Sequence, residues 1–149
     1  MTGHSNEQYS TWMLAAVADA RFAAETGDVP VAALVLDAAG HPIGRGRNER
    51  EKLGDPTAHA EILAIRAAAT ALERWRIGGT LYVTKEPCAM CAAAIAAARI
   101  ERVVFGCYDP KGGAAGSVVD IFESAAVNHR VRVRGACPAA PPSIGDSSS

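Results

Sequence analysis

Apolar and polar positions along the chain follow helical spacing in some segments and strand spacing in others. Small and apolar residues at helical spacing predict an amphipathic helix from Tyr9 to Thr26. A continuous apolar run predicts a strand from Val31 to Leu36, and a second strand follows from Ile43 to Arg47 after the turn residues 37–40. Two strands joined by so short a turn predict a hairpin.

The middle of the chain alternates helices with strands. The expected elements are a helix from Ala58 to Arg74, a strand from Thr80 to Thr84, an Ala-rich helix from Ala89 to Ala98 and a strand from Arg102 to Phe105. Such alternation is typical of an α/β sandwich. Because hairpin strands run antiparallel and helix-linked strands run parallel, we expect a mixed sheet.

The C-terminal part of the chain departs from this pattern. Arg130, Arg132 and Arg134 alternate with valines, which predicts a strand with a solvated face rather than a phosphate-binding stripe. From residue 136 onward, prolines and serines without periodicity predict a disordered tail. We therefore expect one domain over residues 1–135 and a tail over residues 136–149.

Composition narrows the class of protein. The chain has 149 residues, 49% of them hydrophobic, which suffices for one domain with a real core but not for two ordinary domains. A net charge of −1 argues against a protein that coats nucleic acids non-specifically. No apolar run has membrane length, and the N-terminus lacks the basic-then-apolar order of a signal peptide. We expect a soluble, cytoplasmic protein without a membrane partner.

Three candidate zinc ligands and one carboxylate carry the chemistry. His59 precedes Glu61 by two residues, and Cys88 and Cys91 form a Cys-x-x-Cys pair directly after Pro87. One histidine and two cysteines leave the fourth position of a tetrahedral zinc site open for water, as in catalytic sites. Zinc can lower the pKa of that water to about 7, which provides hydroxide at neutral pH. Glu61 can reach the water as a proton carrier without being a ligand.

Both parts of this candidate site are expected at helix N-termini. Residues 55–57 form a stop-and-cap sequence, which places His59 in the first turn of its helix. Pro87 favours a first helical turn, so both cysteines are expected there on one face. Unpaired N–H groups and the positive end of the helix dipole stabilise thiolates. The Cys-x-x-Cys pair is therefore interpreted as a metal site rather than as half of two disulfides.

The H-x-E and P-C-x-x-C pattern is the signature of zinc-dependent nucleobase deaminases. The resemblance extends to the bacterial tRNA-specific adenosine deaminase family. The similar segments cover residues 28–33, 48, 55–61, 80–84 and 103–117, within a likeness that runs from the first helix to Gly135. It implies a cytidine deaminase-like fold: a three-layer α-β-α sandwich with a mixed five-stranded sheet. It also implies a homodimer, Zn2+ as cofactor and hydrolytic conversion of the wobble adenosine in the anticodon loop of tRNA to inosine.

The same resemblance assigns roles to further residues. Glu61 would be catalytic, moving the water proton to the purine ring nitrogen. Asn48 would hydrogen-bond the flipped base, and Val29 and Ala60 would line its pocket. Asp109 would lie in the loop on the substrate side. Each substrate residue also has a plainer interpretation, because Asn48 and Asp109 suit turns and the two apolar residues suit ordinary packing.

Two features depart from the family pattern. Lys85 stands where the family commonly has an apolar residue before Glu-Pro-Cys, so its cation lies beside the pocket wall or extends to solvent along its own stem. The family commonly continues after a segment like the one ending at Gly135 into a C-terminal helix that helps hold the anticodon loop. This chain has the proline-rich segment there instead.

Three functions stay open at this point. The leading hypothesis is tRNA adenosine deamination by a zinc-dependent hydrolase. Its nearest competitor is a deaminase of a free base or nucleoside, of the guanine or cytosine type. The third is a structural zinc module without catalysis, closed by Cys107 or His129 as the fourth ligand. Glu61 argues against this module, because a structural site has no use for it.

Overall fold

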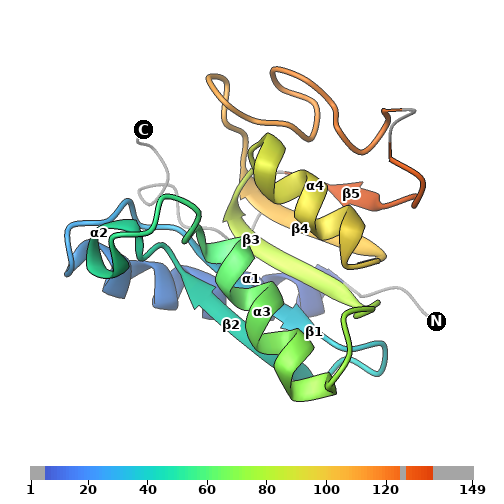
Figure 1. The fold of residues 1–149 in the computed structure, drawn as a ribbon, viewed down its shortest axis with the longest axis horizontal. Coiled ribbons are helices and arrows are strands. Elements are labelled where there is room, and N and C mark those ends of the chain that lie inside the picture. The colour runs from blue at the N-terminus through green and yellow to red at the C-terminus, as the bar shows by residue number, and fades with distance from the viewer. Residues whose placement is uncertain (1–5, 125–126, 136–149) are drawn as a thin grey trace.

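A five-stranded mixed sheet forms the centre of the computed structural model, which describes residues 6–124 and 127–135 (Figure 1). The strands are β1 (Ala32–Leu36), β2 (Pro42–Arg47), β3 (Thr80–Lys85), β4 (Arg102–Cys107) and β5 (Arg132–Arg134). They lie in the order β2-β1-β3-β4-β5. β1 pairs antiparallel with β2 and β3, whereas β4 pairs in parallel with β3 and β5. The mixed sheet expected from the sequence is confirmed.

Helices cover both faces of this sheet. They are α1 (Asn6–Ala24), α2 (Arg50–Leu53), α3 (Ala60–Leu72) and α4 (Ala89–Ala97), of which only the short α2 was not expected. α1 lies behind the sheet in the view of Figure 1, with α3 and α4 in front. Met13 and Val17 of α1 pack with Leu34 and Tyr82 in the smaller core. The larger core lies on the side of α3 and α4, which completes the three-layer α-β-α sandwich.

α3 rests directly on the backbone of β2, because β2 has glycines where the two elements meet. A Cβ at Gly44 would lie 2.4 Å from the carbonyl oxygen of Ala64, and one at Gly46 would lie 2.4 Å from that of Ala60. Ala60 and Ala64 expose none of their surface. This contact fixes the first turn of α3 against the sheet, and the strand pattern alone did not predict it.

β5 confirms the predicted arginine-rich strand, but its solvated face is only partial. Arg132 and Val133 are exposed. Arg134 instead places its Cζ 4.1 Å from the ring centroid of Tyr9 on α1, within the range of a cation–π contact. The prediction of a solvated face is therefore wrong for Arg134, because the edge of the sheet at β5 reaches the aromatic side chain of α1.

Some sequence predictions fall outside the described residues. The tail predicted for residues 136–149 lies there, so the domain boundary at residue 135 stays a prediction. Among the residues that are described, no helix combines the length and the apolar character needed to cross a membrane.

Candidate active site

The three predicted zinc ligands meet at one end of the sheet, where α3 and α4 begin. Nδ1 of His59 lies 3.7 Å from Sγ of Cys88 and 3.6 Å from Sγ of Cys91. Zinc bonds of roughly 2.0 Å to nitrogen and 2.3 Å to sulfur at a tetrahedral angle separate the two atoms by about 3.5 Å. Within residues 6–124 and 127–135, this is the only group of three such side chains with metal-ligand spacing. The residues fit zinc.

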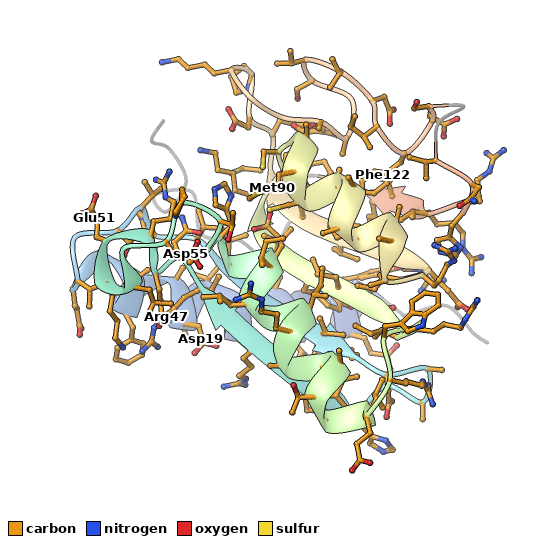
Figure 2. The ribbon with its side chains drawn as sticks, in the orientation of Figure 1. Asp19, Arg47, Glu51, Asp55, Met90 and Phe122 are labelled. Atoms are coloured by element: carbon orange, nitrogen blue, oxygen red, sulfur yellow. The ribbon has the colours of Figure 1, made fainter. Side chains whose placement is uncertain are left out.

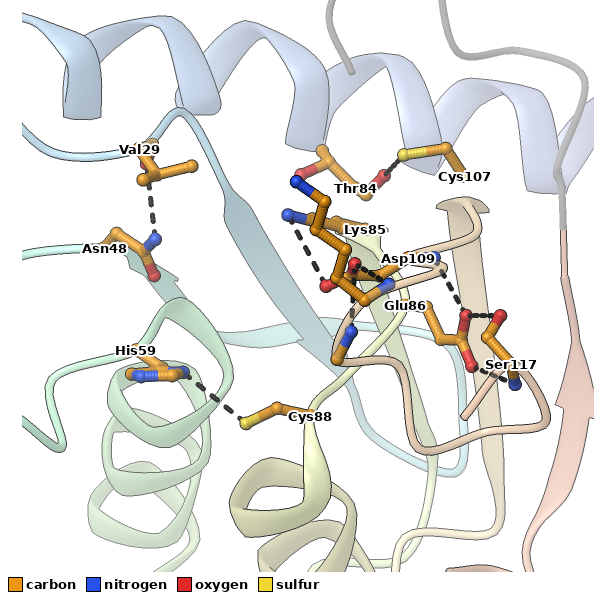
Figure 3. Close-up of polar contacts among 12 residues, drawn as sticks. Val29, Asn48, His59, Thr84, Lys85, Glu86, Cys88, Cys107, Asp109 and Ser117 are labelled. Atoms are coloured by element: carbon orange, nitrogen blue, oxygen red, sulfur yellow. Dashed lines mark hydrogen bonds and ion pairs between the residues drawn. The ribbon is translucent and has the colours of Figure 1, made fainter. Parts of the chain in front are cut away.

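His59 and Cys88 are the N-cap residues of α3 and α4. Both have extended backbone, with φ −76 and ψ 154 at His59 and φ −78 and ψ 178 at Cys88, and neither side chain caps its helix. The two side chains point toward each other instead (Figure 3). The sequence predicts both residues, and Pro87, inside a first helical turn. That prediction is wrong by one position for His59 and Cys88 and by two for Pro87. These two ligands occupy the non-helical N-cap position before each helix.

The two thiols are electrostatically coupled. A hydrogen bond from Cys91 lowers the pKa of Cys88 to about 5, against an opposing effect of burial. The same hydrogen bond, together with burial, raises the pKa of Cys91. Because cysteines bind zinc as thiolates, metal binding at this pair releases protons.

Glu61 lies in the first turn of α3 and is almost completely buried, with 4% of its surface exposed. Burial raises the pKa of its carboxyl from 4.5 to about 7. The charge of Cys88 raises this pKa as well, whereas Lys85 lowers it. Both protonation states are therefore populated at neutral pH, which suits a group that takes up a proton and returns it.

Asn48 connects the two residues predicted to line the base pocket. It is 7% exposed, and its Oδ1 accepts a hydrogen bond from the backbone N–H of Ala60 at 2.9 Å. Its Nδ2 donates to the carbonyl oxygen of Val29 at 3.3 Å (Figure 3). Asn48 thus satisfies the first N–H of α3, which His59 leaves uncapped. Ala60 belongs to the main core and Val29 packs against it. The contact of these three residues with a base stays a prediction.

Lys85 and Asp109 form an ion pair at the end of β3. Nζ of Lys85 lies 3.6 Å from Oδ2 of Asp109, and both side chains are largely buried, at 23% and 21% exposure. Oδ1 of Asp109 accepts hydrogen bonds from the N–H groups of Lys111 and Gly112. Lys85 therefore holds its cation in this ion pair instead of extending it freely into solvent. Asp109 acts as a turn residue here, and its contact with RNA stays a prediction.

Sequence reasoning missed Glu86, the residue between Lys85 and Pro87. Its side chain is 3% exposed. Burial raises the pKa of this carboxyl, but hydrogen bonds from Ser117, Asp109 and Ala115 outweigh burial and hold it below its usual value. The available signal was an acidic residue at the end of a buried apolar strand, where a carboxylate needs partners.

The hypothesis of a closed structural zinc site is wrong. The thiol of Cys107 donates to the carbonyl oxygen of Thr84 at 3.5 Å, and Nε2 of His129 lies 2.8 Å from the carbonyl oxygen of Ile100. Neither residue joins the ligand cluster that the described part of the chain contains. Among residues 6–124 and 127–135, the site therefore offers three candidate protein ligands, with a carboxylate nearby.

Comparisons with known proteins agree with this geometry. The family model of the cytidine and deoxycytidylate deaminase zinc-binding region matches residues 6–107. The tRNA-specific adenosine deaminase of Bacillus subtilis (strain 168) is 45% identical over 127 residues, which cover 85% of this chain and 78% of that protein.

Solved structures of deaminases superpose on this chain. A structure from work on A-to-I editing by tRNA:A34 deaminases superposes with a TM-score of 0.79 at 46% identity, covering 83% of this chain and 95% of that one. A guanine deaminase from Bacillus subtilis superposes with a TM-score of 0.63 at 31% identity, covering 82% and 81%. The chain therefore belongs to the cytidine and deoxycytidylate deaminase zinc-binding family and, within it, to the tRNA-specific adenosine deaminases.

Proposed function

We propose that this protein is a zinc-dependent hydrolase that converts the wobble adenosine of tRNA to inosine. The observation that carries the proposal is the cluster of His59, Cys88 and Cys91 with Glu61 buried at the start of the same helix. The cluster supplies a metal site with three protein ligands, and Glu61 supplies a proton carrier that titrates near pH 7. The identity to tRNA-specific adenosine deaminases supports the substrate.

The residues of the chain divide the chemistry between them. His59, Cys88 and Cys91 would hold the zinc ion, which would supply hydroxide at neutral pH by lowering the pKa of water. Glu61 accepts the proton of that water and passes it to the purine ring nitrogen, which prepares C6 for attack. Glu61 then moves the proton of the new hydroxyl group on C6 to the amino nitrogen, so that the C6–N bond breaks and ammonia leaves. Its burial keeps bulk water from exchanging with these protons.

The remaining predicted residues hold the base in this proposal. Asn48 has hydrogen-bonding capacity beyond its contacts with Val29 and Ala60, because an amide has two donor hydrogens and two acceptor lone pairs. It therefore recognises the flipped adenosine while keeping α3 capped. Val29 and Ala60 form the wall of the pocket near this amide, and Asp109 contacts the RNA beside it.

The homodimer and the cytoplasmic location are parts of the same proposal. Exposed apolar side chains include Met90 at the start of α4 (Figure 2), together with Val118 and Val119. The N–H of Ala114, four residues before Val118, donates to the carbonyl oxygen of Pro87, which joins this segment to the start of α4. An apolar surface at this end of α4 supports a contact between two copies. The proposed tRNA substrate supports a cytoplasmic location of the protein.

The paired charges around Asn48 predict weak binding to the phosphates of tRNA. Three cations around Asn48 are already paired with acids: Arg45 with Asp19 at 3.7 Å, and Arg47 and Lys52 with Glu49 at 3.7 and 3.8 Å. Such pairs reduce the charge available for phosphates, which supply much of the affinity for nucleic acids. A short anticodon stem-loop with an unpaired adenosine is therefore a suitable first substrate, because little unstacking is needed.

Product analysis tests the proposal. The zinc-loaded protein is incubated separately with the adenosine-34 stem-loop, full tRNA, adenosine, guanine and cytosine, and products are separated by chromatography and mass. We expect inosine in the stem-loop and in tRNA, and no turnover of the three small molecules. Conversion of guanine or cytosine without inosine in RNA would transfer the assignment to the free-base deaminases.

A further inference from the structure

One buried side chain holds both ends of the loop from Asp109 to Ser117, called here the 109–117 loop. Oε1 of Glu86 accepts a hydrogen bond from the N–H of Asp109 at 2.9 Å (Figure 3). Oε2 accepts from the N–H groups of Ala115 and Ser117 at 2.9 and 3.0 Å. The hydroxyl of Ser117 donates to Oε1 as well. Four donors thus converge on one carboxylate.

The middle of the 109–117 loop is packed on the same carboxylate. A Cβ at Gly113 would lie 2.3 Å from Cδ and Oε1 of Glu86, so only glycine fits there without a shift. The N–H of Gly113 closes the loop on the carbonyl oxygen of Asp109 at 2.9 Å, and the N–H of Ala114 donates to that of Pro87 at 2.8 Å. The loop therefore follows the contour of Glu86 and Pro87 with no space between them.

This attachment places the loop beside the reacting groups. Glu86 lies two residues before the ligand Cys88, and the loop bonds to Pro87 between them. At its start, Asp109 pairs with Lys85, whose charge acts on Glu61. Lys111 in the same loop is exposed, and an exposed ammonium suits an RNA phosphate.

We propose that Glu86 is a positioning residue, which fixes the 109–117 loop next to the zinc site so that the loop holds the RNA that flanks the reacting adenosine. The inference rests on the proposed tRNA function. Glu86 acts through the loop, because its carboxylate is fully engaged by four loop donors and does not belong to the ligand cluster. Its loss therefore weakens RNA binding and leaves the chemical step in place.

Glu86→Gln is the first test, because the amide keeps the shape of the side chain but replaces one acceptor oxygen with a donor. We expect KM for the adenosine-34 stem-loop to rise about tenfold or more, with kcat within about twofold and zinc content unchanged. Amide hydrogen exchange should become faster in residues 109–117 and stay unchanged in α3. Glu101→Gln, at an exposed glutamate just before β4, is the matched control and should change none of these quantities.

Ser117→Ala approaches the same contact from the loop and keeps the proposal testable if Glu86→Gln folds poorly. It should raise KM in the same direction by a smaller factor. The double variant should resemble Glu86→Gln alone, because residues that act as one unit are not additive. Loss of zinc, a fall in kcat without a change in KM, unchanged loop exchange or additive effects would each overturn the positioning role.

Failure of the function itself would look different. A wild-type protein that binds zinc but forms no inosine in the stem-loop would overturn the proposed function. Hydrogen exchange of the 109–117 loop in Glu86→Gln would still decide whether Glu86 holds that loop.

Discussion

The zinc cluster and the 109–117 loop lie side by side, but the chain builds them in different ways. The cluster comes from two short motifs, each at the start of a helix, in which the N-cap residue is itself a ligand. The loop is fixed by Glu86, which lies 23 residues before Asp109 and 31 before Ser117. Short motifs thus mark the zinc ligands, although His59 and Cys88 lie 29 residues apart, whereas no motif marks the residue that positions the loop. The two should therefore fail separately.

Removing a ligand should have the largest effect. Cys88→Ala should lose zinc, lose activity and lower the Tm by about 5 °C or more, because metal binding free energy is shared with folding when the site joins two helices. Metal analysis and thermal melts with and without chelator measure this. Cys107→Ala is the control and should keep its zinc, since Cys107 lies outside the ligand cluster. Stoichiometric zinc in Cys88→Ala would mean that the ligands are wrongly assigned.

Removing the proton carrier should affect only the chemical step. Glu61→Gln should keep zinc and fold normally while kcat falls about 10²- to 10⁴-fold, the usual contribution of general acid–base catalysis. Metal content and inosine formation are measured on the same preparation. Zinc loss would instead make Glu61 a ligand, and substantial turnover would remove it from the mechanism.

The 109–117 loop can also be perturbed without changing Glu61 or Glu86. Gly113→Ala introduces a Cβ that would lie 2.3 Å from the carboxyl group of Glu86, so the loop must shift. We expect a higher KM for the stem-loop, unchanged zinc and a stability loss of about 1–3 kcal/mol, as for overpacking elsewhere. Gly112→Ala is the neighbouring control, because its Cβ would lie 3.5 Å from Oδ2 of Asp109, an ordinary contact. Equal effects of both variants would contradict the packing described for Gly113.

The same difference explains what the sequence could predict. Short motifs identified the four residues of the site, because local spacing fixes which side chains share one helix face. The His-x-Glu motif marked His59 and Glu61, and the Cys-x-x-Cys motif at a helix start marked Cys88 and Cys91. The role of Glu86 had no such signal, since its partners lie in a distant loop without periodicity. The same holds for the fold. Strand and helix patterns predicted the mixed sheet, whereas the close approach of α3 to the glycines of β2 depends on tertiary packing and had no local signal.

The smallest effect is expected at the ion pair of Lys85 and Asp109. Burial raises the pKa of Asp109. Hydrogen bonds from Lys111 and Gly112 and the charge of Lys85 lower it by more, so the net pKa lies below 3.8. A lowered pKa stabilises the fold above pH 3.8, and this contribution is lost as the pH falls through the folded-state pKa. Lys85→Met should raise this pKa and shrink the acid-range slope of stability.

The stability change at neutral pH should stay within about 1 kcal/mol, because the pair is partly solvated. Carboxyl NMR of Asp109 across the acid range measures the pKa shift, with Lys52→Met as a control at another paired lysine. An unchanged pKa of Asp109 in Lys85→Met would show that the pair is not electrostatically coupled.

Steady-state kinetics of zinc-loaded Glu61→Gln and Glu86→Gln on one adenosine-34 stem-loop test the separation of chemistry from positioning most directly. The structure predicts that Glu61→Gln lowers kcat with little change in KM, and that Glu86→Gln raises KM with little change in kcat. The separation of chemistry from positioning would be contradicted if kcat alone fell in both variants, or if kcat alone fell in neither.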